Sequence, residues 1–301
     1  MAARSEQVVS AERPVRSLVL TGFGINCEEE MAAAYRLAGG QAEVVHLNAV
    51  LHGRVRLDDW DVLNFPGGFS FGDDLGAGRV LANKVRFRRL PTGATLLDEL
   101  QRFIARGGYV VGVCNGFQAL VKLGLLPNVG GSYLQEVTLT TNEPGGRFED
   151  RWCHCRVRPG NPSPFFAGLT QLDLPVRHKE GRLVIATPAL REAIVERGLV
   201  CLTYCTTDGQ PATTYPELPN GSDLACAALT DPSGHVLGLM PHPEAFLSRY
   251  NHPDWPRIRR ASATAGASDD GAGLALFRNI VSHVKRERLA CAQSDQERSR
   301  S

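Results

Sequence analysis

One cysteine in this 301-residue sequence stands in a pattern that is typical of an enzymatic nucleophile. Cys114 follows the apolar run Tyr109–Val113 and precedes a helical pattern near Phe117–Leu123. Gly112 and Gly116 flank it, as a sharp strand-to-helix turn requires where strand and helix crowd each other. Such a turn exposes the sulfur at the carboxyl edge of a sheet, and the helix N-terminus favours the thiolate. The pattern predicts covalent catalysis, whereas an isolated cysteine before a helix would more often be structural.

A cysteine nucleophile needs a base and a group that orients the base, and the segment around His242 offers both. His242 and Glu244 are two residues apart, so in an extended chain their side chains project to the same side. Pro241 and Pro243 disfavour a helix there. Glu244 would then hold the imidazole in one tautomer while the other nitrogen faces the sulfur. On its own, the same spacing would also fit an exposed loop histidine beside a solvated glutamate.

A glycine-rich turn after a third apolar run predicts a site for developing negative charge. The run Asp61–Phe65 ends at Pro66, and two glycines follow it. Backbone N–H groups can approach an oxyanion closely in such a turn. The expected donors are the amides of Gly68, Phe69 and Asn115. An ordinary Pro-Gly turn is the alternative interpretation.

The elements that must position these residues alternate between strands and helices in the first half of the chain. Apolar runs predict strands at Val15–Leu20, Ala42–Leu47, Asp61–Phe65 and Tyr109–Val113, and helical spacing predicts helices at Glu28–Ala38, after Thr95 and near Phe117–Leu123. Alternation of this kind implies βαβ units with right-handed crossovers. We therefore expect an α/β fold with a doubly wound, mostly parallel sheet and flanking helices.

The rest of the chain predicts additional strands within the same domain. They are expected at Leu134–Thr141, Trp152–Arg158, Leu174–His178, Leu183–Ala186, Leu199–Tyr204, Leu224–Leu229 and Val236–Met240, with helices at Ala189–Arg197 and Leu274–Arg286. We expect one domain over residues 15–287, with a flexible inserted loop at 260–273. The tails, residues 1–14 and 288–301, are expected to be disordered.

Composition narrows the possible functions. With 33 basic and 32 acidic residues the net charge is +1, which argues against a general nucleic-acid or membrane-surface binder. No apolar run is long enough to span a bilayer, and the N-terminus has no signal-peptide pattern, so a cytoplasmic protein is expected. The eight cysteines are expected to be reduced. Neither the Cys153/Cys155 pair nor the Cys201/Cys205 pair has convincing zinc-site spacing, so we expect no metal site.

Several motifs together resemble the class I, triad-type glutamine amidotransferases, and within them the phosphoribosylformylglycinamidine synthase family. The similar segments occur in order from about Val15 to Arg286. They are Gly24-Ile25-Asn26-Cys27-Glu28, Pro66-Gly67-Gly68-Phe69-Ser70-Phe71-Gly72-Asp73, Leu75-Gly76-Ala77-Gly78, Gly112-Val113-Cys114-Asn115-Gly116-Phe117-Gln118, His178-Lys179-Glu180-Gly181-Arg182, Asn220-Gly221-Ser222 and Met240-Pro241-His242-Pro243-Glu244. Lys179 stands where this family usually has glycine.

The resemblance implies an α/β amidotransferase fold of flavodoxin type with additional strands. It also implies that Cys114 attacks the side-chain amide of glutamine with His242 and Glu244 as its partners, and we expect Gly67, Gln118 and His178 to bind the substrate. Ammonia would pass to a separate synthetase subunit that uses ATP and magnesium, with or without a third small subunit. The chain has no G-x(4)-G-K-[ST] motif, so no cofactor is expected here.

Two other interpretations remain open from the sequence. The chain could be a different cysteine hydrolase on the same kind of sheet, such as a peptidase or a chaperone-like protein. It could also be a regulatory or scaffold subunit that retains the fold without catalysis. The combination of Cys114, His242 and Glu244 favours the amidotransferase.

Overall fold

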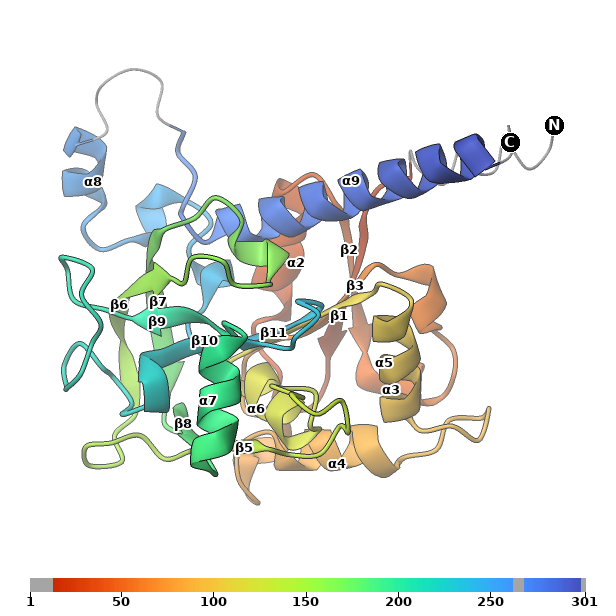
Figure 1. The fold of residues 1–301 in the computed structure, drawn as a ribbon, viewed down its shortest axis with the longest axis horizontal. Helices are drawn as coiled ribbons and strands as arrows, with labels where there is room; N and C mark the ends of the chain where they lie inside the picture. Colours follow the sequence, from red (N-terminus) through yellow and green to blue (C-terminus); the bar gives the residue numbers. More distant parts are fainter. Residues whose placement is uncertain (1–12, 262–267, 299–301) are drawn as a thin grey trace.

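The apolar runs of the sequence form the strands of one large sheet (Figure 1). The computed structural model describes residues 13–261 and 268–298. Nine strands lie in the order β2-β1-β3-β4-β11-β10-β9-β6-β7, and β5 pairs with β8 in a separate two-stranded sheet. The strands are β1 (Arg16–Thr21), β2 (Gln41–His46), β3 (Val62–Phe65), β4 (Tyr109–Val113), β5 (Val137–Thr140), β6 (Glu149–Val157), β7 (Gln171–His178), β8 (Arg182–Ile185), β9 (Val200–Tyr204), β10 (Cys226–Thr230) and β11 (Val236–Leu239).

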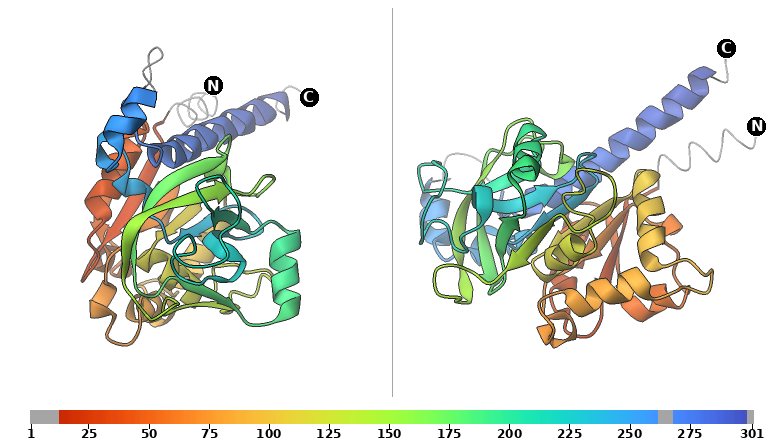
Figure 2. Two further views of the ribbon diagram at one scale, coloured as in Figure 1. Left: turned by 90° about the vertical axis from the view of Figure 1, so that its left-hand side faces the viewer. Right: turned by 60° about the horizontal axis from the view of Figure 1, so that its bottom comes forward.

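Helices cover both faces of one half of this sheet (Figures 1 and 2). On one face α2 packs against α9, where the rings of Tyr35 and Phe277 meet edge to face with centroids 5.1 Å apart. On the other face α4 packs against both α5 and α6. The helices are α2 (Glu28–Leu37), α3 (Leu47–Leu51), α4 (Arg79–Phe87), α5 (Leu96–Ala105), α6 (Asn115–Lys122), α7 (Pro188–Glu196), α8 (Trp255–Ala261) and α9 (Leu274–Arg298).

The covered half of the sheet is parallel. Parallel pairings join the strands β2, β1, β3, β4 and β11. Every residue of β3, β4 and β11 is buried, which is typical of strands covered on both faces. Antiparallel pairings then add β10, β9, β6 and β7, so within this sheet β10 and β6 run against the direction of the other strands. The predicted α/β class, with flanking helices and additional strands, is confirmed.

The register of the central strands brings three distant segments to one edge. Phe65 of β3 lies opposite Gly112 of β4, and Leu239 of β11 lies opposite Val113. Because parallel strands end at the same edge, the segments that follow β3, β4 and β11 meet there. These segments carry the predicted glycine turn, nucleophile and base.

The prediction of a disordered C-terminal tail at 288–301 is wrong for most of its length, because α9 continues to Arg298. The segment 274–298 contains no glycine or proline and is rich in strong helix formers, so nothing local ends the helix at Arg286. The Arg288 side chain also donates hydrogen bonds to Asp61 and to the backbone oxygen of Arg13. Residues 1–12 and 299–301, also predicted to be disordered, lie outside the described residues.

The predicted flexible loop at 260–273 lies only partly within the described residues. Helix α8 reaches Ala261, and residues 262–267 lie outside the described residues. A Cβ on Gly271 would come within 2.3 Å of a backbone oxygen, and one on Gly273 within 2.0 Å. The small residues at the end of this segment therefore permit close backbone packing.

Helices α3, α4 and α8 were not predicted from the sequence. The α4 segment carries basic residues between its apolar ones, and its buried face consists of Leu81, Ala82 and Val85. Within the part of the chain that the structure describes, no helix is long and apolar enough to cross a membrane.

Candidate active site

Cys114 occupies the predicted sharp turn between β4 and α6. Its backbone adopts φ 50° and ψ −103°, a conformation that is unfavourable for a residue with a side chain. A Cβ on Gly116 would lie 1.8 Å from the backbone oxygen of Phe65, and one on Gly112 would lie 2.7 Å from the backbone of Gly116. The two glycines therefore allow the helix to begin directly against the sheet, as the nucleophile-elbow hypothesis requires.

His242 and Glu244 form a buried pair just beyond β11. His242 Nδ1 lies 2.6 Å from Glu244 Oε1, and the side chains are 3% and 1% exposed. The predicted pairing is confirmed, but not the extended conformation: residues 243–245 form a short 3₁₀ turn with Pro243 at its start. Proline is compatible with the first turn of a helix, because its missing N–H has no partner there.

The charge state of His242 reflects two opposed effects. Burial lowers its pKa, but the Glu244 carboxylate and contacts with the thiols of Cys114 and Cys27 outweigh burial, so the pKa lies well above its usual value. The other ring nitrogen, Nε2, is buried and makes no hydrogen bond to any described residue. This arrangement leaves Nε2 available for proton exchange with a reacting group.

The predicted oxyanion donors need one correction. The Phe69 N–H donates to the backbone oxygen of Gly24 at 2.6 Å, so it is already engaged. This contact arises because Gly68, at φ 143°, packs closely against the segment at Gly24, where a Cβ would lie 2.4 Å from the same oxygen. In contrast, the amides of Gly68 and Asn115 donate to no described residue. These two amides remain as candidate donors for an oxyanion.

A hydrogen-bond network joins the glycine turn to the nucleophile helix. The Ser70 N–H donates to Asn115 Oδ1 at 3.1 Å, and Asn115 Nδ2 donates to Gln118 Oε1 at 3.0 Å. Gln118 Nε2 in turn donates to the backbone oxygen of Glu180 at 2.6 Å. Gln118 was predicted to bind substrate, yet both ends of its amide are engaged within the protein. In this structure it connects α6 to the segment that follows β7.

The structure places His178, the last residue of β7, in the same buried region. Burial and, to a smaller extent, the charge of His242 lower the pKa of His178 to about 3, so its ring is neutral at physiological pH. His178 Nδ1 lies 3.2 Å from Asn142 Oδ1, while Nε2 is buried without a hydrogen-bond partner among the described residues. A neutral ring with one unpartnered nitrogen is suited to a polar substrate group.

Gly67, also predicted to bind substrate, lies against the catalytic imidazole. A Cβ at Gly67 would come within 2.7 Å of His242 Cε1 and 3.2 Å of Cys27 Sγ. Any side chain at this position would therefore displace the imidazole or the thiol. The contact gives Gly67 a packing role at the base.

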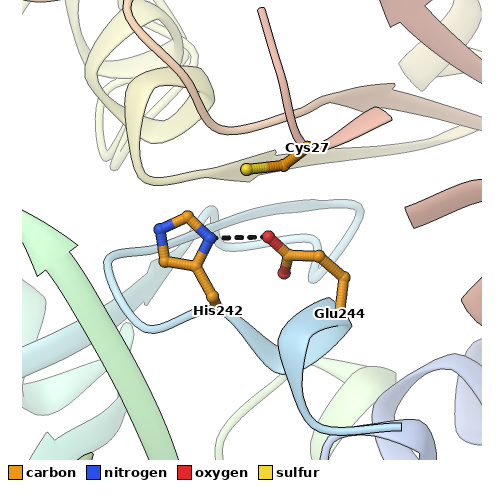
Figure 3. A group of neighbouring side chains, drawn as sticks. All are labelled: Cys27, His242 and Glu244. Carbon is orange, nitrogen blue, oxygen red and sulfur yellow. Dashed lines mark hydrogen bonds and ion pairs between the residues drawn. The ribbon is translucent and has the colours of Figure 1, made fainter. Parts of the chain in front are cut away.

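Sequence reasoning assigned no role to Cys27. Cys27 lies just before α2, and its thiol stands beside the His242–Glu244 pair (Figure 3). One potential metal-ligating atom from each of the three residues lies within 4.8 Å of the others. The only sequence signal was its place in the motif Gly24-Ile25-Asn26-Cys27-Glu28, where spacing alone shows no link to a histidine 215 residues later.

Comparison with known proteins identifies the family of this site. Residues 14–284 match the model of the CobB/CobQ-like glutamine amidotransferase domain. The chain belongs to the glutamine amidotransferases. Within the family, it is 40% identical over 267 residues to phosphoribosylformylglycinamidine synthase subunit PurQ of Dehalococcoides mccartyi, covering 89% of this chain and 96% of the relative. It is 36% identical over 239 residues to the same subunit of Methanococcus maripaludis, covering 79% and 85%.

A solved structure supports the same assignment. The structure described as PurLQS from Thermotoga maritima matches with a TM-score of 0.64 and 25% sequence identity, covering 90% of this chain and 100% of that chain. The resemblance to glutamine amidotransferases that the motifs indicated is thus confirmed over most of the chain. Lys179, where this amidotransferase departs from the family pattern, accepts a 2.8 Å hydrogen bond at its backbone oxygen from the Asn142 N–H.

Proposed function

We propose that this amidotransferase is the glutaminase subunit of a phosphoribosylformylglycinamidine synthase and acts in purine biosynthesis in the cytoplasm. The observation that carries the proposal is the convergence of Cys114 with the buried His242–Glu244 pair at one sheet edge. The curated relatives carry the name of this enzyme's PurQ subunit. A scaffold protein would have no use for a nucleophile held in a strained turn beside a buried base.

The arrangement supports a thioester mechanism. Cys114 Sγ attacks the side-chain amide carbon of glutamine while the proton from the sulfur is held on His242 Nε2, where the raised pKa of the ring favours it. The amides of Gly68 and Asn115 stabilise the oxyanion of the tetrahedral intermediate. His242 then returns the proton to the departing nitrogen, which leaves as ammonia, and a glutamyl thioester remains on Cys114.

Hydrolysis of the thioester completes the cycle. His242 takes a proton from water, the resulting nucleophile attacks the thioester carbon, and glutamate leaves as the thiol is reformed. Glu244 holds the imidazole through Nδ1 in both halves, so Nε2 faces the reacting atoms each time. His178, with its unpartnered Nε2, lies where it can contact the substrate.

The proposal assigns the remaining chemistry to a partner. A synthetase subunit, with a third small subunit in the complex, would receive the ammonia and use ATP and magnesium to convert formylglycinamide ribonucleotide to its amidine. The relative described as PurLQS supports such an assembly. This chain itself would need only glutamine and would bind neither cofactor.

The decisive experiment compares nitrogen sources in the complex reconstituted with the synthetase. We expect the Cys114→Ala variant to lose glutamine-dependent product formation and to retain synthesis from added ammonium. Cys291→Ala, which removes an exposed thiol on α9, is the matched control and should keep both activities. Glutamine-dependent synthesis that survives in Cys114→Ala would overturn the mechanism. Loss of both activities in a folded Cys114→Ala complex would contradict a role limited to ammonia supply.

A further inference from the structure

The Cys27 thiol turns the proposed catalytic pair into a cluster of three different ligand types. A sulfur, an imidazole nitrogen and a carboxylate oxygen lie within 4.8 Å of one another (Figure 3). Thiolate, imidazole and carboxylate are the ligands that zinc prefers in proteins. Cys27 comes from the loop before α2 and the pair from the turn after β11, so the fold rather than the local sequence assembles the set.

A pocket reaches two members of this cluster, Cys27 and Glu244. Its volume is about 340 Å³, and Cys27 and Glu244 both contribute to its wall beside Glu30 and Arg177. Such a pocket can admit a small cation and leaves room for a water molecule as a fourth ligand. The Cys27 side chain is correspondingly only partly buried.

Glu244 provides an independent observation that points to a ligand. Its Oε1 is engaged by His242 Nδ1, but its Oε2 is buried and makes no hydrogen bond to any described residue. A buried carboxylate oxygen without a partner is costly, because it has lost water and gained nothing in exchange. A bound cation would satisfy it.

We propose that Cys27, His242 and Glu244 bind a zinc-like divalent cation that enters through this pocket and inhibits the enzyme. Binding uses the Cys27 thiolate, so the thiol proton is released to solvent. It also uses the lone pair of His242 Nδ1, the ring nitrogen nearer to Glu244, so the Nδ1 proton is released to solvent as well and the one proton left on the ring resides on Nε2. A protonated Nε2 cannot accept the proton of Cys114, and the nucleophile loses its base.

The distances explain why binding and catalysis exclude each other. Nitrogen and oxygen ligands of a tetrahedral zinc ion stand about 3.3 Å apart. In the structure, His242 Nδ1 and Glu244 Oε1 are 2.6 Å apart. The cation must therefore replace this hydrogen bond, and with it the interaction that orients the imidazole. The inhibition rests on the proposed function of His242, whereas cation binding does not.

The first experiment measures binding alone, on the full chain. Zinc affinity is determined by competition with a chromophoric chelator, and cobalt(II) is used as a spectroscopic probe of thiolate ligation. We expect one ion per chain and a thiolate-to-cobalt charge-transfer band in the wild type, in Cys291→Ala and in Cys114→Ala. Cys27→Ala and Cys27→Ser should lose the band and at least tenfold in affinity; the serine variant preserves the shape of the side chain.

The outcomes of this experiment distinguish a cation site at Cys27 from a cation site elsewhere in the chain. Binding that survives in both Cys27 variants and disappears in Cys114→Ala would place the ion on the nucleophile and overturn the proposal. Stoichiometric binding without a thiolate band would overturn it as well. Glu244→Gln provides a second variant if both Cys27 variants fail to fold, and it should also weaken zinc binding.

The second experiment measures inhibition in the reconstituted complex. Zinc should suppress glutamine-dependent synthesis while leaving ammonium-dependent synthesis intact, and a chelator should restore the activity. A complex that binds zinc as predicted but never hydrolyses glutamine would refute the proposed function and leave the cation site standing. Zinc binding at Cys27 without any effect on an active glutaminase would refute the inhibition.

Discussion

Nδ1 of His242 lies 2.6 Å from Oε1 of Glu244, and neither side chain is appreciably exposed. Two residues so close in sequence meet because a 3₁₀ turn follows the histidine directly. In the dry interior a hydrogen bond between an imidazole and a carboxylate is stronger than it would be in water. Glu244 therefore holds the imidazole of His242 in one orientation. Substitution of Glu244 tests how strongly catalysis depends on that orientation.

The Glu244→Gln substitution should preserve the shape of the side chain but change which ring nitrogen of His242 carries the proton. A glutamine amide can donate to Nδ1 and so favour the wrong imidazole tautomer, as in other triads. We expect glutamine-dependent turnover to fall by roughly 10²–10⁴-fold, with a much smaller change in KM. Steady-state kinetics of the reconstituted complex measure this, and ammonium-dependent synthesis is the internal control. An unchanged kcat would show that Glu244 does not orient the base.

Gly116→Ala should disrupt the nucleophile turn, because the new methyl group would lie 1.8 Å from the backbone oxygen of Phe65. Strand β3 and helix α6 would have to separate. We expect the free energy of unfolding to drop by about 3 kcal/mol or more, since overpacking costs of 1–3 kcal/mol are common even at more tolerant sites.

Gly130→Ala is the matched control for that substitution. A Cβ at Gly130 meets only a flexible side-chain oxygen, 3.8 Å away. Its effect should stay within about 0.5 kcal/mol. Denaturant unfolding of both variants tests the pair, and equal destabilisation would contradict the close approach of strand and helix.

His178 should make the protein less stable in acid. Its pKa is lowered to about 3 by burial and then by the charge of His242, while the unfolded chain has the usual value of 6.5. Between these pH values the unfolded state binds a proton that the folded state does not, so the free energy of unfolding falls as the pH falls. The contribution of this residue is at most about 1.4 kcal/mol per pH unit.

Urea unfolding of the wild type and of His178→Gln between pH 7 and pH 5 would measure this contribution. The wild type should lose stability more steeply than the variant, because glutamine does not titrate. Parallel pH profiles for the two proteins would mean that the His178 ring is charged or solvated in the folded state.

Arg288→Ala tests the unexpected length of α9. The Arg288 side chain forms an ion pair with Asp61, whose own side chain is 10% exposed and also bonds to the Arg16 N–H. Loss of one partner of a mostly buried carboxylate should cost about 1–3 kcal/mol of unfolding free energy. Lys285→Ala, at an exposed position on the same helix, should stay within about 0.5 kcal/mol. Equal thermal denaturation of the two variants would show that α9 does not dock through Arg288.

The sequence allowed prediction of features that depend on local spacing. The glycines around Cys114 indicate the elbow because steric crowding at such a turn is a local requirement. The two-residue spacing of His242 and Glu244 likewise indicates their pairing, although the turn that achieves it was predicted as extended chain. Alternating strands and helices predicted the α/β class for the same reason.

The features that escaped prediction depend on contacts between distant segments. Cys27 approaches His242 only because β1 and β11 end at the same edge of the sheet. The engagement of the Phe69 amide depends on how closely Gly68 lies against Gly24. The C-terminal helix extends beyond the expected end because side chains such as Arg288 find partners near the N-terminus. None of these distances can be read from spacing along the chain.

The pairing of β11 with both β4 and β10 has a consequence for biosynthesis of the protein. As the ribosome completes residues 13–235, the parallel strands β2-β1-β3-β4 and the antiparallel strands β10-β9-β6-β7 are already present, but no strand joins them. Strand β11 is made last and closes this gap, and the base follows three residues after its end. A nascent or prematurely terminated chain therefore exposes its nucleophile strand as a sheet edge and has no catalytic histidine. The strand that completes the sheet and the catalytic histidine are thus synthesised within a few residues of each other.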